Sequence, residues 1–127
     1  MLTKVYGSAV FGVEATTITV EVNVDIGIGY HLVGLPDNAI KESNYRIAAA
    51  LQNNGYKIPG KKLIINMSPA DLRKEGSAYD LTLAMGILVA TGQIKEKFPL
   101  DEYIIMGELS LDGSLQPIRG ALPISIK

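Results

Sequence analysis

The 127-residue sequence contains no cysteine, no tryptophan and a single histidine, His31. Without cysteine, the chain has neither a disulfide nor a thiolate metal ligand. One histidine without cysteine also does not make a typical zinc site. A catalytic triad would need a carboxylate to orient the histidine, and His31 lies in a short segment between Tyr30 and Leu32. We therefore expect no metal site and a structural or surface role for His31.

Long hydrophobic runs and an excess of one charge are missing as well. The formal net charge is −1, so the surface as a whole has no strong field to attract nucleic acid or anionic lipid, although it leaves room for a small basic patch. No run of about 18 apolar residues is free of charge, and the first residues contain no apolar signal core. We expect a cytoplasmic protein with no membrane partner.

The apolar residues that are present suffice for one hydrophobic core. They make up 47% of the chain, and the length fits a single domain over residues 1–127. The last residues, Ile124-Ser-Ile-Lys127, stop within an apolar pattern that has no helix cap or polar tail. We expect the domain to be truncated at its C-terminal end.

The clearest periodic signal lies in residues 14–26, where apolar and polar residues alternate as in a strand with one buried face. Further strands are predicted at residues 2–10, 30–33, 62–68 and 103–106, and a hairpin is predicted to join residues 109–111 to 115–118 through Asp112-Gly113. One helix is predicted to run from the N-cap Asp37 to Asn53-Asn54-Gly55. A second helix, apolar nearly all round, is predicted from about Tyr79 to Thr91. These elements indicate an α+β (mixed α/β) fold, in which helices pack on one face of a mostly antiparallel or mixed sheet.

A glycine-rich segment at residues 55–61 reads Gly-Tyr-Lys-Ile-Pro-Gly-Lys and matches most of the phosphate-loop pattern. That loop requires a strand before it and a helix after it, so that backbone amides face the phosphates. Here the predicted helix precedes the segment and a strand follows it. The next residue, Lys62, also lacks the hydroxyl that holds magnesium. We interpret the segment as a turn.

The densest polar cluster, residues 69–80, allows two interpretations. In the first, Ser77 or Asp80 caps the second helix and the charges form a solvated loop. In the second, a serine near a lysine at a helix start forms a nucleophile pair, with the lysine desolvated so that it acts as the base. Spacing alone does not choose between them. Glu108 and Asp112 lie on a strand and a turn, so they predict no acid–base pair.

Three stretches together resemble the N-terminal domain of the Mg-chelatase-like AAA+ proteins, the group that includes the competence protein ComM. They are Val33-Gly-Leu-Pro-Asp-Asn-Ala-Ile-Lys-Glu-Ser43, Asn66-Met-Ser-Pro-Ala-Asp-Leu-Arg-Lys-Glu-Gly76 and Gly107-Glu-Leu-Ser-Leu-Asp-Gly113. The motif positions, which include Asp80 just after the second stretch, are Gly34, Pro36, Asp37, Lys41, Glu42, Pro69, Asp71, Arg73, Lys74, Glu75, Gly76, Asp80, Gly107, Glu108, Asp112 and Gly113.

The resemblance implies a domain with the fold of ribosomal protein S5 domain 2, which is shared with the proteolytic domain of Lon and the C-terminal domain of RadA. It also implies that an AAA+ ATPase module, absent from this chain, follows the domain and forms a hexamer. In ComM that motor is associated with DNA branch migration during natural transformation. ATP and Mg²⁺ are then expected for the ATPase module, and no cofactor is expected for this fragment. The implied partners are the chain's own ATPase module, neighbouring protomers and single-stranded or branched DNA.

The similarity to Lon allows a residue-by-residue comparison. Ala78 occupies the position of the nucleophilic serine, and Leu122 occupies the position of the lysine. Neither side chain does that chemistry, so the resemblance implies no catalytic residue here. Ser77 lies one residue away, a displacement that turns a side chain by about 100° at a helix start. Candidate contacts to DNA or to the ATPase ring are basic loop residues, which are otherwise ordinary solubilising charges: Lys57, Lys61, Lys62, Arg73, Lys74 and Arg119.

Two other functions remain as alternatives to a non-catalytic accessory domain. One is a Lon-like serine peptidase that uses Ser77 as its nucleophile. The other is a partner ATPase of a Mg-chelatase that acts in cofactor synthesis, although the sequence offers no ligand set for a tetrapyrrole or a metal.

Overall fold

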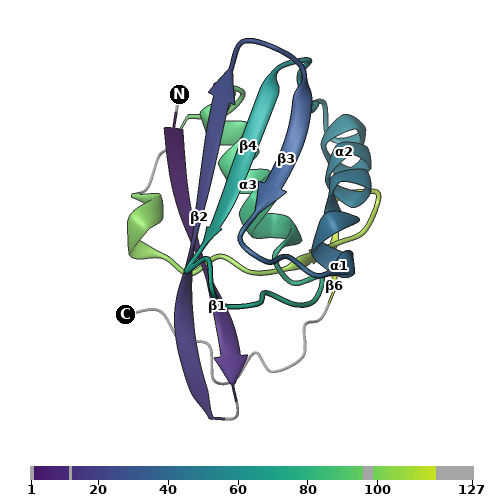
Figure 1. Cartoon of the computed structure of the whole chain (residues 1–127). Helices are drawn as coiled ribbons and strands as arrows, with labels where there is room; N and C mark the ends of the chain where they lie inside the picture. Colours follow the sequence, from purple (N-terminus) through teal and green to yellow (C-terminus); the bar gives the residue numbers. More distant parts are fainter. Residues whose placement is uncertain (1, 12, 96–98, 117–127) are drawn as a thin grey trace.

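The backbone is built around one mixed four-stranded sheet (Figure 1). The computed structural model describes residues 2–11, 13–95 and 99–116 of the chain. The strands are β1 (Leu2–Phe11), β2 (Glu14–Asp25), β3 (Gly29–Val33) and β4 (Lys62–Ser68). They lie in the order β1-β2-β4-β3. The pairs β1–β2 and β2–β4 are antiparallel, whereas β3 runs parallel to β4.

Two long helices cover one face of this sheet. They are α2 (Ser43–Asn53), preceded by the short helix α1 (Asn38–Lys41), and α3 (Asp80–Ala90). Both lie on the same side of the strands in Figure 1. A 3₁₀ turn, η1 (Leu100–Glu102), and a two-stranded hairpin of β5 (Glu108–Leu109) and β6 (Leu115–Gln116) complete the described part of the chain.

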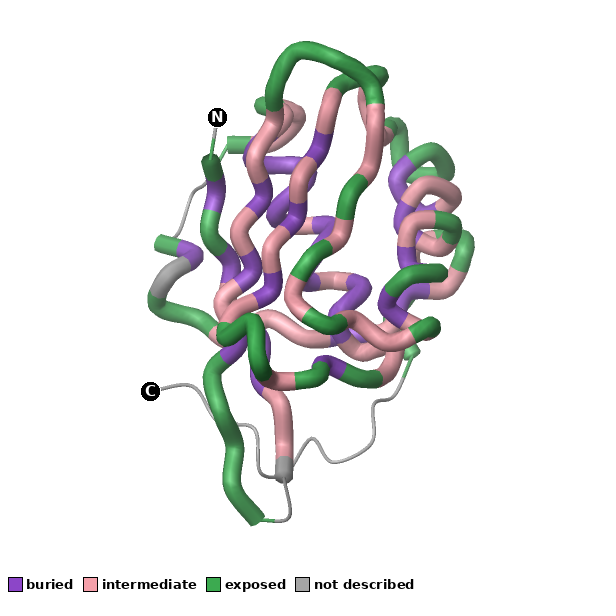
Figure 2. The backbone as a smooth tube through the Cα atoms, in the orientation of Figure 1, coloured by how far each residue is buried: buried purple, intermediate pink, exposed green. Residues whose placement is uncertain are grey.

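The core lies between the sheet and the helices. Alternate residues of β2 and β4 are fully buried, which is the period of two expected for strands with one covered face. They pack against α3, most of whose residues are buried (Figure 2). The α+β class and the placement of helices on one sheet face are therefore confirmed. The fully buried residues include Ile18, Val20, Val22, Leu63, Ile65, Met67, Leu83 and Ile87.

The predicted helix limits hold with one change. Asp37 caps α1 because its Oδ1 accepts a hydrogen bond from the backbone N of Ile40 at 2.9 Å. The predicted single helix is divided at Glu42 into α1 and α2. Beside this break the Ser43 hydroxyl donates to the backbone O of Ile40, a side-chain bond that competes with the backbone hydrogen bonds of a helix. At the far end, α2 stops at Asn53 and Gly55 has φ +83°, the left-handed conformation expected there.

The predicted strand at residues 103–106 is wrong. Only Ile104 forms an isolated bridge to Tyr6, supported by a 2.8 Å bond from Ile105 N to Tyr6 O. The next backbone groups turn towards the start of α3: Ile105 O accepts from the Thr82 hydroxyl, and Gly107 N donates to Ala78 O at 2.7 Å. These bonds to α3 leave no continuous edge for a strand. The predicted hairpin is present but shorter, and Ile118 lies outside the described residues.

Gly34 permits a close approach between the loop after β3 and the backbone of β4. It has φ +105°, and a Cβ at this position would lie 2.0 Å from the carbonyl oxygen of Met67 on β4. By comparison, Gly55 also has positive φ, but nothing lies within 4 Å of its Cβ position. A substitution at Gly34 would therefore cause both steric overlap and backbone strain, whereas one at Gly55 would cause backbone strain alone.

We predict that Gly34→Ala destabilises the chain by at least roughly 3 kcal/mol, because overpacking adds to the cost of left-handed backbone. Gly55→Ala should cost only about 1 kcal/mol, from backbone strain alone. Urea denaturation of both variants measures the difference. Equal losses would show that the contact with Met67 carries no energy.

Tyr79 joins the start of α3 to β1 and is almost fully buried. Its hydroxyl donates to the backbone O of Ser8 at 3.1 Å. Burial, together with the negative charge of Asp37, raises the pKa of Tyr79 to about 12. A tyrosine in the unfolded chain ionises near about pH 10. Tyr79 therefore contributes stability that is complete below that pH and is lost as the pH rises towards 12.

The free energy of unfolding of the wild type should consequently fall relative to Tyr79→Phe between about pH 10 and pH 12. Urea denaturation of both proteins at several alkaline pH values measures this difference. A difference that stays constant across the interval would contradict the buried, protonated phenol.

Candidate functional site

The three motif stretches of the sequence meet at one end of the sheet. Because β3 and β4 are parallel, the loops that follow them leave the same end of the sheet. The first loop contains Gly34 and Asp37, and the second contains the polar run up to the start of α3. The third stretch reaches the same place through the bonds of Gly107 to the first residues of α3. We call this assembly, residues 34–37, 69–80 and 107–108, the motif cluster.

Lys74 lies at the centre of the motif cluster with its side chain fully buried. The Lys74 ammonium donates to Gly34 O at 2.8 Å and also to Pro69 O. Its backbone N donates to Leu35 O at 3.0 Å, and its carbonyl accepts from Asp37 N at 3.0 Å. One residue thus joins the loop after β3 to the loop after β4. Burial lowers the pKa of the Lys74 ammonium, while the charge of Asp71 acts in the opposite direction.

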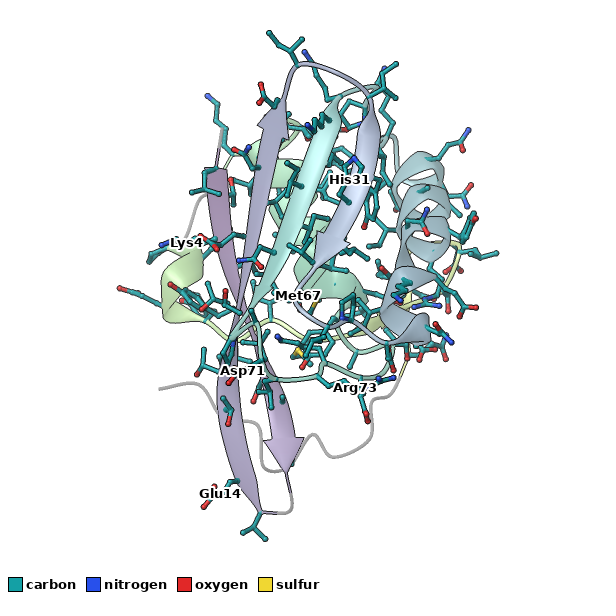
Figure 3. The ribbon with its side chains drawn as sticks, viewed as in Figure 1. Lys4, Glu14, His31, Met67, Asp71 and Arg73 are labelled. Carbon is teal, nitrogen blue, oxygen red and sulfur yellow. The ribbon has the colours of Figure 1, made fainter. Side chains whose placement is uncertain are left out.

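The burial of Lys74 corrects its assignment as a contact to DNA or to the ATPase ring. An ammonium group that is shielded from solvent and occupied by two carbonyls has no free surface to offer a phosphate. From the sequence, Lys74 was predicted to be a solvated loop charge, because it stands between two other charged residues, Arg73 and Glu75. Its neighbours Arg73 and Glu75 do point to solvent, 67% and 70% exposed, and form a 3.3 Å ion pair. Arg73 therefore stays a candidate surface residue (Figure 3).

Asp37 joins the first loop to the second through both carboxylate oxygens. Oδ1 caps α1, and Oδ2 accepts a 2.9 Å bond from the backbone N of Gly76. Gly76 has φ +92°, a conformation that glycine adopts without steric cost. The predicted capping role of Asp37 is confirmed, and its second bond extends that role to the loop after β4.

Asp80 binds Arg46 instead of capping α3. Its two oxygens accept from Arg46 Nε at 2.7 Å and Arg46 Nη2 at 2.9 Å. Oδ2 also accepts from Leu109 N at 3.1 Å. The hydrogen bond to Asp80 raises the pKa of Arg46, against the opposing effect of its partial burial. The prediction that Ser77 or Asp80 caps α3 is wrong, because Tyr79 is the N-cap and no side chain supplies a capping bond.

Arg46 is a member of this assembly that sequence reasoning missed. It also donates to the backbone O of Ala39 at 2.8 Å, so it links α1, α2 and α3. Arg46 and Asp80 are 34 residues apart, and no local pattern in the sequence connects them. In the sequence, Arg46 is only a basic residue within a predicted helix. Such residues are mostly exposed at the surface, so nothing marked it as part of a site.

Ser77 hydrogen-bonds to a carboxylate and not to a lysine. Its hydroxyl bonds to Glu108 Oε1. The nearest lysine in the sequence, Lys74, is occupied by backbone carbonyls. The Ser–Lys interpretation needs an amine within hydrogen-bond reach of the hydroxyl, and no such bond joins Ser77 to a lysine in residues 2–11, 13–95 and 99–116. Ala78 lies two residues before α3. The predicted positions Arg119 and Leu122 lie outside the described residues.

Asp112 stabilises the turn between β5 and β6 through hydrogen bonds. Its Oδ1 accepts from the backbone N of Ser114 at 2.9 Å and from its hydroxyl at 2.7 Å, and these bonds lower the pKa of Asp112. Asn53, the last residue of α2, and its C-cap Asn54 donate to the carbonyls of Leu111 and Asp112, respectively. The carboxylates of Asp112 and Glu108 therefore have separate structural partners.

The other predicted basic contacts lie far from the motif cluster. Lys61 directly precedes β4, Lys62 is the first of its seven residues, and Arg73 follows its end. The two groups are therefore separated by about 20 Å along the strand. Helix α2 precedes the glycine-rich segment and β4 follows it, as predicted for a turn and not for a phosphate loop. Lys57 lies on the same connection, where its backbone pairs with the side chain of Gln93.

The remaining predicted positions show no part in the motif cluster. His31 is exposed on the outer face of β3 (Figure 3), and Lys41 and Glu42 are exposed beside α1. Among the described residues, no group of three or more His, Cys, Asp or Glu side chains is placed to hold a metal ion. None of the described helices has the length and apolar character needed to cross a membrane.

The family model described as "Subunit ChlI of Mg-chelatase" matches residues 20–127. The chain belongs to the ChlI family. Similar proteins include the uncharacterised protein YifB of Escherichia coli, 45% identical over 122 residues, and the competence protein ComM of Haemophilus influenzae, 41% identical over 123 residues. The first match covers 95% of this chain and the second 96%, but each covers only 24% of the relative. The ChlI-family chain thus spans about a quarter of the length of these relatives, and the resemblance stated from three motifs is confirmed.

We predict that Lys74→Met destabilises this ChlI-family domain by roughly 2–4 kcal/mol. The substitution keeps most of the side-chain volume but leaves the carbonyls of Gly34 and Pro69 without their charged donor. That loss outweighs the gain from removing a desolvated charge. Lys61→Met, at an exposed position, is the matched control and should change stability by less than about 0.5 kcal/mol. Thermal and urea denaturation measure both. A Lys74→Met protein as stable as the control would disprove the bridging role.

Proposed function

We propose that this chain is a non-catalytic accessory domain of a ComM-type AAA+ ATPase. In this proposal, the parent protein is a hexameric DNA-remodelling motor that migrates branched DNA during recombination or natural transformation. ATP and Mg²⁺ belong to the ATPase module, and the domain described here positions the ring or the DNA. Its partners are the ATPase module, neighbouring protomers and single-stranded or branched DNA.

The observation that carries this proposal is the internal use of the motif side chains. Lys74 bonds to two carbonyls, Asp37 to two backbone amides, and Asp80 to Arg46 and a backbone amide. A catalytic group needs a free face towards a substrate. Charged side chains that bond to other groups of the fold support a structural role for the motif cluster. The similarity to ComM and the quarter-length coverage support an attachment to a larger motor.

The experiment compares the parent protein with a version that lacks residues 1–127. We expect the parent protein to hydrolyse ATP faster in the presence of a four-way DNA junction. The shortened protein should keep its basal ATP hydrolysis and lose most of the stimulation by DNA, because the ATP site lies elsewhere. A coupled ATPase assay and light scattering measure the hydrolysis rate and the oligomeric state.

Two results would contradict parts of the proposal. Cleavage of casein by the 127-residue chain that disappears in Ser77→Ala would show that the domain is a peptidase. ATP hydrolysis that responds to a tetrapyrrole and not to DNA would favour the second candidate, a Mg-chelatase ATPase subunit. The family description "Subunit ChlI of Mg-chelatase" is the observation that favours this second candidate.

A further inference from the structure

The loop between β2 and β3 presents two isoleucines to solvent. Ile26 is 90% exposed and Ile28 is 88% exposed. Gly27 and Gly29 alternate with them and have positive φ, +125° and +155°, so the loop follows a path that side-chain-bearing residues rarely adopt. Within residues 2–11, 13–95 and 99–116 nothing covers these two side chains, so they bring the described fold little stability.

Two lysines flank this loop. Lys62 pairs with both Asp25 and Gly29 in the sheet register, and the backbone N of Gly29 donates to Lys61 O at 3.3 Å. The position of a Cβ on Gly27 would lie 3.5 Å from Cβ of Lys62. We call Ile26, Ile28, Lys61 and Lys62 the isoleucine–lysine tip. It forms the exposed arch at the top of Figures 1 and 2, at the end of the sheet opposite the motif cluster.

The tip has an excess of positive charge. Within the described ranges, neither Lys61 nor Lys62 forms an ion pair. The acidic residue of the loop, Asp25, uses Oδ1 to accept a 2.7 Å bond from the backbone N of Ile26. Two ammonium groups therefore stand against one carboxylate beside two exposed apolar side chains. This arrangement complements a partner that offers both negative charge and flat apolar surface.

Unstacked DNA offers both features at this scale. Its phosphates attract lysine ammonium groups, and the faces of its bases are apolar. Apolar side chains such as isoleucine lie against base faces, at an unstacking cost that a paired duplex imposes and an unpaired strand does not. A fully paired duplex hides those faces in the stack, whereas single strands and branch points expose them. We propose that the isoleucine–lysine tip binds unpaired bases of single-stranded or branched DNA. Ile26 and Ile28 lie against base faces, and Lys61 and Lys62 contact phosphates. This inference rests on the proposed function, because it assigns the DNA contact of that function to one loop.

The test measures binding of the 127-residue chain to a fluorescent oligothymidine by anisotropy at several salt concentrations. The variants are Ile26→Ser/Ile28→Ser, Lys61→Gln/Lys62→Gln and the control Val13→Ser. Val13 is 94% exposed on the opposite hairpin. All five positions lie in loops or at a strand end and none is buried, so thermal denaturation of each variant should match the wild type.

We expect the isoleucine variant to weaken binding about fivefold to tenfold, because it loses part of the apolar burial of two isoleucine side chains, with an unchanged dependence on salt. The lysine variant should reduce the slope of log affinity against log salt by about 1.4, which corresponds to two phosphate contacts on a single strand. Val13→Ser should bind like the wild type. A paired duplex of the same length should bind more weakly and respond less to the isoleucine change.

Three outcomes would overturn the inference, and they separate it from the proposed function. Binding to oligothymidine that the isoleucine change does not affect places the contact elsewhere and leaves the DNA role intact. Absence of binding at low salt removes the DNA contact from this domain, while the ATPase comparison still tests the accessory role. Isoleucine-dependent sedimentation with phosphatidylserine vesicles, without DNA binding, identifies an anionic lipid surface as the partner.

Discussion

The bonds of the Lys74 ammonium to Gly34 O and Pro69 O hold the motif cluster of this domain together. A buried ammonium is costly unless hydrogen bonds replace its water. Here it has carbonyl acceptors from two loops, and bonds from a charged donor are stronger than neutral ones. The two loops follow parallel neighbouring strands, which no direct turn connects. Lys74 supplies the link that the strand topology does not.

The other polar residues of the motif cluster extend this link to the helices. Asp37 connects the start of α1 to Gly76, and Asp80 connects α3 to Arg46 on α2 and to Leu109 on β5. Each carboxylate accepts from backbone or guanidinium donors, so its charge is compensated inside the fold. The densest group of charged residues in the sequence is consequently a framework. Its composition resembles that of an active site, but its hydrogen bonds are directed inward.

The two ends of the sheet thus differ in character. At the end where β3 and β4 finish, polar groups are buried and paired. At the other end, two isoleucines of the β2–β3 loop are exposed, and two lysines at the start of β4 form no ion pair with another described residue. Strand β4 connects the two ends rigidly, because its inward residues Leu63, Ile65 and Met67 are fully buried in the core. A contact made at the tip is therefore held in a defined position relative to the motif cluster.

The sequence by itself determined the parts of this protein that depend on near neighbours. The alternation in residues 14–26, the buried run at residues 62–68 and the cap at Asp37 all follow from contacts within a few residues or from one period of burial. They appear in the structure as β2, β4 and α1. The three motifs also sufficed to indicate the family that the comparisons confirm.

Only the tertiary structure decided which charges are buried. Arg73, Lys74 and Glu75 are equivalent in a linear pattern, but a carbonyl from 40 residues away and another from five residues away take the ammonium of Lys74 inward. Contacts between distant parts of the chain also decided two other features. They pair Asp80 with Arg46, and they reduce the expected strand at residues 103–106 to one bridge with Tyr6. Local periodicity reports which face of an element is apolar. The choice of partner for a polar group depends on which distant backbone atoms folding brings within hydrogen-bond distance.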